Sequence, residues 1–223
     1  AGGDVTLQAQ AVGSTLDALS DTAARIEASG ATLTGRDLHL QASAEHRSTL
    51  APLVTKTTSA TIEVDGSTLE ASGRATLEAT ATAAIATPDV VPLAVVDVDV
   101  AASVRVQGDT RITSAGPARL GATTTTTIDA RPGLPDLGAL PADAGAAIVI
   151  ADTTASVDLL GNAELASTAD KTELVASNRT TVDAAVDASA AGSSAVGGSV
   201  AGSAVSCPAL RRPNACAGLQ RLT

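Results

Sequence analysis

A repeated pattern spaced by glycines runs through most of this chain and limits what it can fold into. Each copy has an apolar–x–apolar triplet, a glycine, one Leu or Ile three or four residues later, a second break, and an alternating segment. The copy from Ala60 to Ala79 reads ATIEVDGSTLEASGRATLEA. The copies align on four first glycines, which are 36, 42 and 53 residues apart: Gly30, Gly66, Gly108 and Gly161.

The apolar residues inside each copy alternate with period two, as in Leu38-His39-Leu40-Gln41-Ala42. This is the period of a β-strand and not the 3.6 residues of an α-helix. Val, Ile and Thr favour strands, and glycine supplies turns with positive φ. Each copy is therefore predicted to be a strand, a turn, a short strand, a second turn and a longer strand.

The absence of aromatic residues and methionine favours a thin, elongated core. The chain has no Phe, Tyr, Trp or Met, and 44% of its residues are hydrophobic. One copy buries too few Leu, Ile and Val side chains to offset the entropy of ordering its backbone, so no copy is expected to fold alone. Stacking the copies shares these contacts and satisfies the hydrogen bonds of every strand. We predict an all-β, parallel β-helix (β-solenoid) with loops of unequal length between its rungs.

Two other structures are less consistent with the sequence. Alanine is the best helix former, so Ala184 to Ala191 has helical propensity, but Thr, Val, Gly and Ser dominate the rest of the chain. A disordered chain is disfavoured by the high hydrophobic content. The body is expected to lack helices.

The sequence divides into three parts. We expect solenoid repeats over residues 1–182, an Ala/Gly/Ser-rich terminal rung or linker over 183–206, and an irregular C-terminal tail over 207–223. Cys207 and Cys216 both lie in this tail, and either a small disulfide loop or two free thiols fits their spacing.

Segments of variable length and composition separate the copies. Three of them carry most of the proline residues and are expected to be loop tips: Leu50 to Thr57, Thr87 to Leu93 and Arg131 to Gly145. Length variation confined to one place in each repeat is typical of insertions at one edge of a solenoid.

The charge of the chain excludes several partners. Its 14 Lys and Arg face 24 Asp and Glu, for a formal net charge of -10. No basic patch or aromatic platform is visible for nucleic acid, and an anionic membrane surface would repel the chain. The longest apolar run, Val90 to Val96, is short and contains Pro92, so no membrane-spanning helix is predicted.

The repeat A-x-I-x-x-x-G-x-x-L-x-A-G-x-x-x-L-x-A and the phrase SSAVGGSVA at Ser193 to Ala201 carry a family resemblance. They resemble the large repetitive bacterial surface proteins of the filamentous-haemagglutinin-like adhesin and autotransporter-passenger type, over roughly residues 2–205. The resemblance implies a right-handed parallel β-helix, secretion to the cell surface, and adhesive or scaffold roles. It transfers no catalytic residue. We expect an internal fragment of a longer protein, because the sequence begins in mid-repeat and neither a secretion region nor a membrane barrel of these proteins is recognised in it.

Few residues suggest chemistry. His39 and His46 are the only histidines, and both are predicted to lie on the solvated surface, because no Cys or His spacing supplies further metal ligands. Asp97 and Asp99 alternate and are expected on one strand face, where solvation is favoured over Ca²⁺ binding or acid catalysis.

A run of threonines and a glycosylation sequon complete the candidates. Alternate hydroxyls of Thr123 to Thr127 are expected on one face, and Ser43-Ala44-Glu45 and Thr80-Ala81-Thr82 stand at matching positions of other copies. Such an array is analogous to the face of an ice-binding solenoid. Asn178-Arg179-Thr180 matches a sequon, a short match that is common by chance. No catalytic triad, nucleophile elbow or phosphate loop is present.

We predict a non-enzymatic structural or adhesive segment of a secreted or cell-surface bacterial repeat protein, associated with the outer membrane or released. The alternative is a solenoid carbohydrate-active enzyme or an ice-binding protein. No catalytic residue, cofactor or metal is predicted. The expected partners are neighbouring repeats of a longer parent chain and host or matrix glycans or proteins, contacted through loops at Ala51 to Thr55, Pro88 to Leu93 and Arg131 to Gly145.

Overall fold

A computed structural model describes most of the 223 residues. It describes residues 3–13, 21–49, 53–87, 93–132, 142–168, 171–185, 196–206 and 217–222, and for 142–145, 196–206 and 217–222 the backbone alone. All regular structure in these residues is β-strand.

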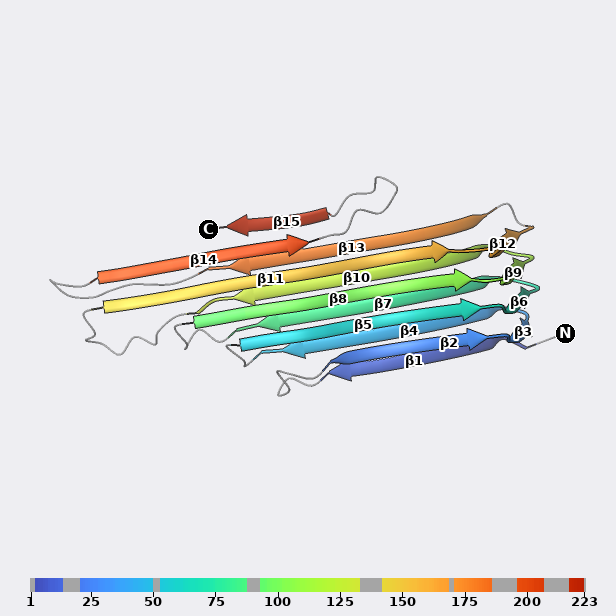
Figure 1. Ribbon diagram of the computed structural model, residues 1–223, viewed down its shortest axis with the longest axis horizontal. Coiled ribbons are helices and arrows are strands. Elements are labelled where there is room, and N and C mark those ends of the chain that lie inside the picture. The colour runs from blue at the N-terminus through green and yellow to red at the C-terminus, as the bar shows by residue number, and fades with distance from the viewer. Residues whose placement is uncertain are drawn as a thin grey trace.

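The strands form three parallel sheets, which we call sheets A, B and C (Figure 1). Sheet A contains, in spatial order, β1 (Val5–Gly13), β4 (Leu38–Ser48), β7 (Ala75–Ala86), β10 (Ala118–Ala130), β13 (Thr172–Ala184) and β15 (Ala217–Leu222). Sheet B contains β2 (Thr22–Ser29), β5 (Leu53–Asp65), β8 (Leu93–Gln107), β11 (Ala142–Leu159) and β14 (Val196–Ser206). Sheet C contains the short strands β3 (Thr32–Gly35), β6 (Thr68–Ala71), β9 (Arg111–Ser114) and β12 (Glu164–Ser167).

The chain visits sheets B, C and A in that order, and each such visit makes one rung of the stack. Figure 1 shows that strands of sheets A and B run in opposite directions, with the short strands of sheet C joining them at one end of the molecule. We call this end the turn end and the opposite one the loop end. The predicted parallel β-helix is confirmed.

The register of the strands aligns the repeats as their glycines do. In sheet C, the single Leu or Ile that follows each first glycine stacks in one column, Leu33–Leu69–Ile112–Leu165. In sheet A, a second column runs Leu7–Leu40–Leu77–Leu120–Leu174. These columns form the apolar interior between the sheets, where Leu40, Leu77 and Leu120 are fully buried.

The four first glycines turn the chain from sheet B into sheet C with positive φ: Gly30 (59°), Gly66 (53°), Gly108 (68°) and Gly161 (68°). Two buried hydroxyls next to these turns bind the backbone, and the sequence patterns did not predict them. Ser67 Oγ donates to the Asp65 carbonyl at 2.9 Å and accepts from the Ala31 amide at 3.1 Å. Thr110 Oγ1 donates to the Gln107 carbonyl at 2.5 Å. Such bonds satisfy corner backbone groups that no strand pairs.

The loops at the loop end are shorter than the sequence predicted. Leu53 to Thr57 belongs to β5 and Ala142 to Gly145 belongs to β11, so assigning these residues to loop tips was wrong. Leu53 to Thr57 pairs in register with β8, and Ala142 to Gly145 pairs in register with β14, so each segment continues its strand. Parts of the predicted loops lie outside the described residues, namely 50–52, 88–92 and 133–141.

The C-terminal part adds two strands. β14 extends sheet B beside β11, and β15 pairs with residues Arg179 to Ala184 of β13. A strand therefore occupies part of the tail that was expected to be irregular. Cys207 and Cys216 lie outside the described residues, as does most of the segment with helical propensity, whose first residue, Ala184, ends β13.

Candidate functional site

The two histidines lie on opposite sides of the same strand. His39 points outward, opposite to the buried Leu38 and Leu40, as predicted. His46 is fully buried, so the prediction of a surface position for it was wrong. Its position is even-numbered, like the inward Leu40 and Ala44, and continuing the alternation of β4 by two residues would have placed it inside.

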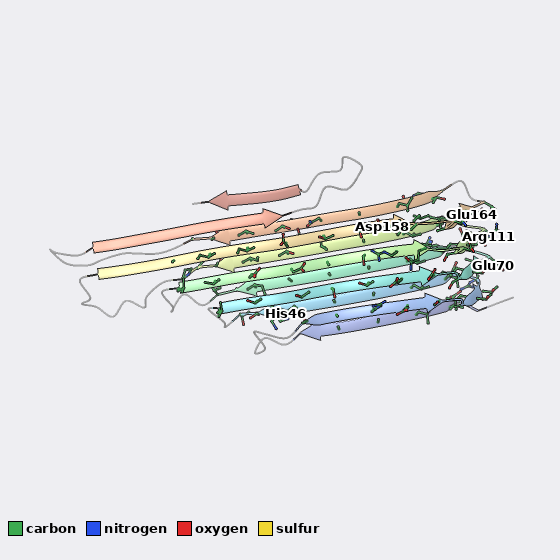
Figure 2. All side chains as sticks on the ribbon, viewed as in Figure 1. His46, Glu70, Arg111, Asp158 and Glu164 are labelled. Atoms are coloured by element: carbon green, nitrogen blue, oxygen red, sulfur yellow. The ribbon has the colours of Figure 1, made fainter. Side chains whose placement is uncertain are left out.

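The His46 ring fills a space that a glycine leaves open. Gly13 of β1 pairs in register with His46, and a Cβ atom at Gly13 would lie 2.2 Å from Nδ1 of the ring and 2.4 Å from Oγ1 of Thr22. The imidazole therefore packs against the β1 backbone between sheets A and B. Figure 2 shows His46 near the loop end of the core. Lys56, in the first part of β5, is also buried near this end.

Asp97 and Asp99 lie together on the outer face of sheet B, as predicted. Asp99 pairs in register with Asp152 of β11, which is exposed as well. Burial raises the pKa of the Asp99 carboxyl, and the like charges of Asp152, Asp97 and Asp21 raise it further. Within the described part of the chain, no three His, Cys, Asp or Glu side chains are arranged to hold a metal ion.

The threonine run alternates between the two faces of β10. Thr124 and Thr126 are buried, and Thr123, Thr125 and Thr127 point outward. Thr123 and Thr125 pair in register with Thr80 and Thr82. Four outward threonines thus form a two-by-two array on sheet A, with Ser43 and Ser177 extending the column of Thr80 and Thr123.

The sequon asparagine is engaged inside the molecule. Asn178 Nδ2 donates to the Thr153 carbonyl at 2.9 Å and to Thr153 Oγ1 at 2.6 Å. Thr180 is buried, and its hydroxyl lies 3.2 Å from that of Thr153. This cluster joins β11 to β13 across the interior, and a glycan on Asn178 would break it.

A groove of mixed charge crosses the outer face of sheet A near the turn end, and the sequence patterns did not predict it. Its charged and polar lining residues are Asp37, His39, Arg74, Thr76, Glu78, Arg119, Lys171 and Glu173. Arg119 lies 3.2 Å from the Glu78 carboxylate and 3.5 Å from that of Glu173, measured between N and O atoms. Lys171 bonds Glu173 at 3.0 Å and lowers the pKa of that carboxyl. A general acid needs a raised pKa, so this environment does not suit acid catalysis by Glu173.

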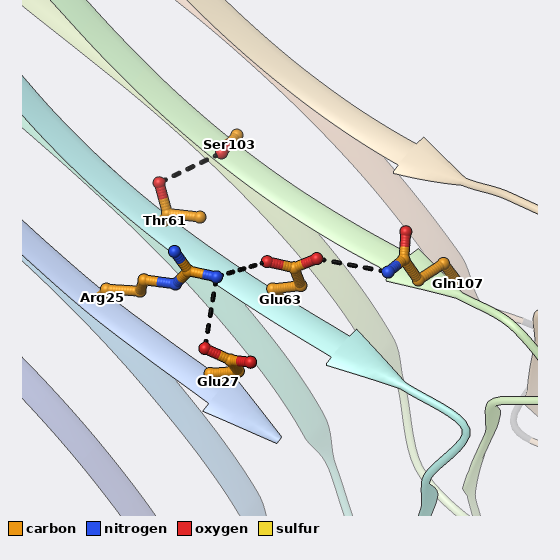
Figure 3. Close-up of polar contacts among 6 residues, drawn as sticks. All are labelled: Arg25, Glu27, Thr61, Glu63, Ser103 and Gln107. Carbon is orange, nitrogen blue, oxygen red and sulfur yellow. Dashed lines mark hydrogen bonds and ion pairs between the residues drawn. The ribbon is translucent and has the colours of Figure 1, made fainter. Parts of the chain in front are cut away.

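The outer face of sheet B carries polar ladders toward the turn end. Arg25 of β2 bonds Glu63 of β5 at 2.8 Å, and Gln107 of β8 donates to the other oxygen of Glu63 at 3.2 Å (Figure 3). Ser103 and Thr61 add a hydroxyl contact of 3.4 Å between neighbouring rungs. These side chains are exposed or half-buried, so each contact stabilises the stack only slightly.

No family model, curated protein or solved structure matches this chain. The described residues contain no helix of the length and apolarity needed to cross a membrane.

Proposed function

We propose that this chain is a non-enzymatic structural and adhesive segment of a secreted or cell-surface bacterial repeat protein. Its rungs build an elongated stack, and its surfaces and loops make the adhesive contacts. The repeat pattern that resembles filamentous-haemagglutinin-like adhesins and autotransporter passengers supports this proposal. The ion-paired carboxylates of the mixed-charge groove favour it over a carbohydrate-active enzyme.

The observation that carries the proposal is the leucine column of sheet A. Leu40, Leu77 and Leu120 are fully buried, whereas Leu7 is 37% exposed and Leu174 is 52% exposed. The same core position is thus solvent-accessible in the first and last rungs of the column. Solenoid repeats are stabilised by their neighbours, so exposed core leucines favour further rungs as partners. This exposure supports the proposal that the chain is one section of a longer stack.

The proposed location is the bacterial cell surface or the extracellular space, and the proposed ligands are host or matrix glycans or proteins. Antibodies against the purified chain should label intact cells of the producing organism, and protease added outside should remove the signal. Beads coated with the chain should be retained on extracellular-matrix layers. Labelling that requires permeabilised cells would contradict the location, and beads that are not retained would contradict the adhesive role.

Ice binding is a second candidate, favoured by the two-by-two threonine array on sheet A. Neighbouring strands space these hydroxyls by about 4.8 Å, and positions two apart along a strand by about 7 Å. If the array binds ice, the chain will shape ice crystals and lower their growth temperature, and Thr82→Glu with Thr125→Glu will abolish both effects. An unaltered growth habit with the wild-type chain would exclude this candidate.

A further inference from the structure

An apolar patch lies on the outer face of sheet B near the loop end. It consists of Leu53, Leu93, Val95, Ile148 and Ile150. Four of these side chains are 43–58% exposed. The strand register makes the patch contiguous, because Leu53, Val95 and Ile148 stand side by side on β5, β8 and β11.

A row of carboxylates borders the patch. Asp97 stands beside Ile150, and one step further along the strands Asp99 stands beside Asp152. The neighbouring positions on β5 are Thr55 and Thr57, so none of these positions carries a Lys or Arg. The raised pKa of Asp99, caused by burial and by the charges of Asp152, Asp97 and Asp21, is consistent with a cluster of negative charge that nearby cations do not neutralise.

The combination of apolar patch and carboxylate row defines what can cover this face. A second copy placed face to face with its strands running in the same direction would oppose carboxylates to carboxylates, and an anionic membrane would meet the same repulsion. A partner with aliphatic side chains and cations satisfies both halves of the surface. We propose that the apolar patch and the carboxylate row bind a protein segment that combines exposed aliphatic side chains with Lys or Arg.

The geometry sets the spacing that such a segment needs. Positions two apart along a strand are about 7 Å apart, so the carboxylates of Asp99 and Asp152 lie about 14 Å from the level of Leu53 and Ile148. The segment therefore places its aliphatic and cationic groups about nine residues apart on a helix or about four residues apart on an extended strand. Apolar area gives affinity at the patch, and the carboxylates orient the segment and accelerate its association.

This inference rests on the proposed adhesive role and names the chemistry of a partner. The proposed binding is tested with the full chain and three synthetic peptides. One alternates Leu with Lys, the second alternates Leu with Glu, and the third alternates Ser with Lys. Binding is followed by titration calorimetry or fluorescence anisotropy at two salt concentrations. We expect the Leu/Lys peptide to bind and the other two to bind at least tenfold more weakly.

Two double variants separate the parts of the surface. Asp99→Asn with Asp152→Asn should weaken Leu/Lys binding roughly threefold to tenfold and reduce its salt dependence. Ile148→Thr with Ile150→Thr keeps β-branched residues and should weaken binding about tenfold. The matched controls are Glu70→Gln with Asp158→Asn and Leu160→Thr. Glu70 and Leu160 are exposed and Asp158 is half-buried, and all three are far along the strands from the patch, so binding should be unchanged (Figure 2 labels Glu70 and Asp158).

Circular dichroism and thermal unfolding of every variant verify folding before binding is compared. The inference is overturned if no peptide binds, if Ser/Lys binds as tightly as Leu/Lys, or if the controls weaken binding as much as the patch variants. Such a failure leaves the proposed function standing when the intact-cell labelling and bead assays succeed. If those assays fail while the patch variants behave as expected, the proposed function is wrong and the binding surface remains.

Discussion

Gly13 and His46 illustrate how single residues decide the packing of this thin core. The glycine lacks the Cβ atom that would meet the imidazole, so the His46 ring fits between the sheets. Gly13→Ala is expected to destabilise the protein by about 1–3 kcal/mol through overpacking. In a His46→Ala background the same change should cost about 1 kcal/mol less, since the ring is gone and only Oγ1 of Thr22 still meets the new Cβ atom.

Chemical denaturation of the four proteins in this double-mutant cycle measures the coupling. Gly121→Ala serves as the control, because a Cβ atom there meets its nearest neighbours at 3.7 Å. An unchanged cost of Gly13→Ala in the two backgrounds would refute the contact.

Thr126 is buried, and its hydroxyl has no hydrogen-bond partner among the described residues. Valine has nearly the same shape and no polar group, so Thr126→Val is expected to raise the free energy of unfolding by about 1 kcal/mol. Thr125 points outward on the same strand, and Thr125→Val should change stability by no more than about 0.5 kcal/mol. Equal effects at the two positions, measured by urea unfolding, would contradict the inward and outward assignment.

The raised pKa of Asp99 gives stability a pH dependence of defined sign. Because the folded protein binds this proton more tightly than the unfolded chain, stability is lost as pH rises from the ordinary Asp pKa through the raised one. Asp99→Asn should therefore stabilise the protein at pH 7, and the gain should vanish at acidic pH below the ordinary pKa. Asp99 is exposed, so solvent limits the gain to less than about 1 kcal/mol. Unfolding curves from pH 3 to 8 that show a gain only at acidic pH would reverse this assignment.

At the scale of an element, the turn glycines follow the ends of β2, β5, β8 and β11 in sheet B. Gly66 has a φ of 53°, and no atom lies within 4 Å of a Cβ placed there. Gly66→Ala is therefore expected to cost about 1–2 kcal/mol for conformational reasons alone. Gly66→Asn should cost less, because asparagine tolerates this region better. Thermal unfolding of both variants provides the comparison, and an alanine variant as stable as the asparagine variant would argue against the left-handed turn.

The strands and their register could be predicted from the sequence because one rule, alternation between glycines, governs both. Leu69 and Ile112 stack because each follows its first glycine at a similar distance. The same rule applied further along β4 would have found the buried His46. Lys56 lies in phase with Val54 and Ile62, but the preference of charged residues for solvent concealed its inward position.

The candidate surfaces were harder to predict, because they depend on neighbours far apart in sequence. Asp99 and Asp152 belong to different rungs, and only the register of β8 with β11 brings them together. The apolar patch likewise joins Leu53 to Ile148 across an intervening strand. Loop boundaries were predicted less well, since Leu53 to Thr57 carries both strand residues and loop-like polarity.

At the scale of the whole molecule, the chain is a stack in which every interior rung is stabilised by the rungs on either side. Core positions lose their burial at both ends of the leucine column. Residues distant in sequence therefore touch only if the strands are parallel and in register. This register is the central claim, because the leucine columns, the threonine array and the proposed binding surface all depend on it.

Cysteine cross-linking tests this register directly. In a Cys207→Ser/Cys216→Ser background, Thr80→Cys with Thr123→Cys places two cysteines on neighbouring strands with their Cα atoms about 4.8 Å apart, within disulfide range. Thr80→Cys with Thr127→Cys places them about 14 Å apart along the strands. We expect mild oxidation to cross-link the first pair rapidly and the second pair hardly at all. Efficient cross-linking of the second pair, or failure of the first in a folded protein, would contradict the parallel in-register stack.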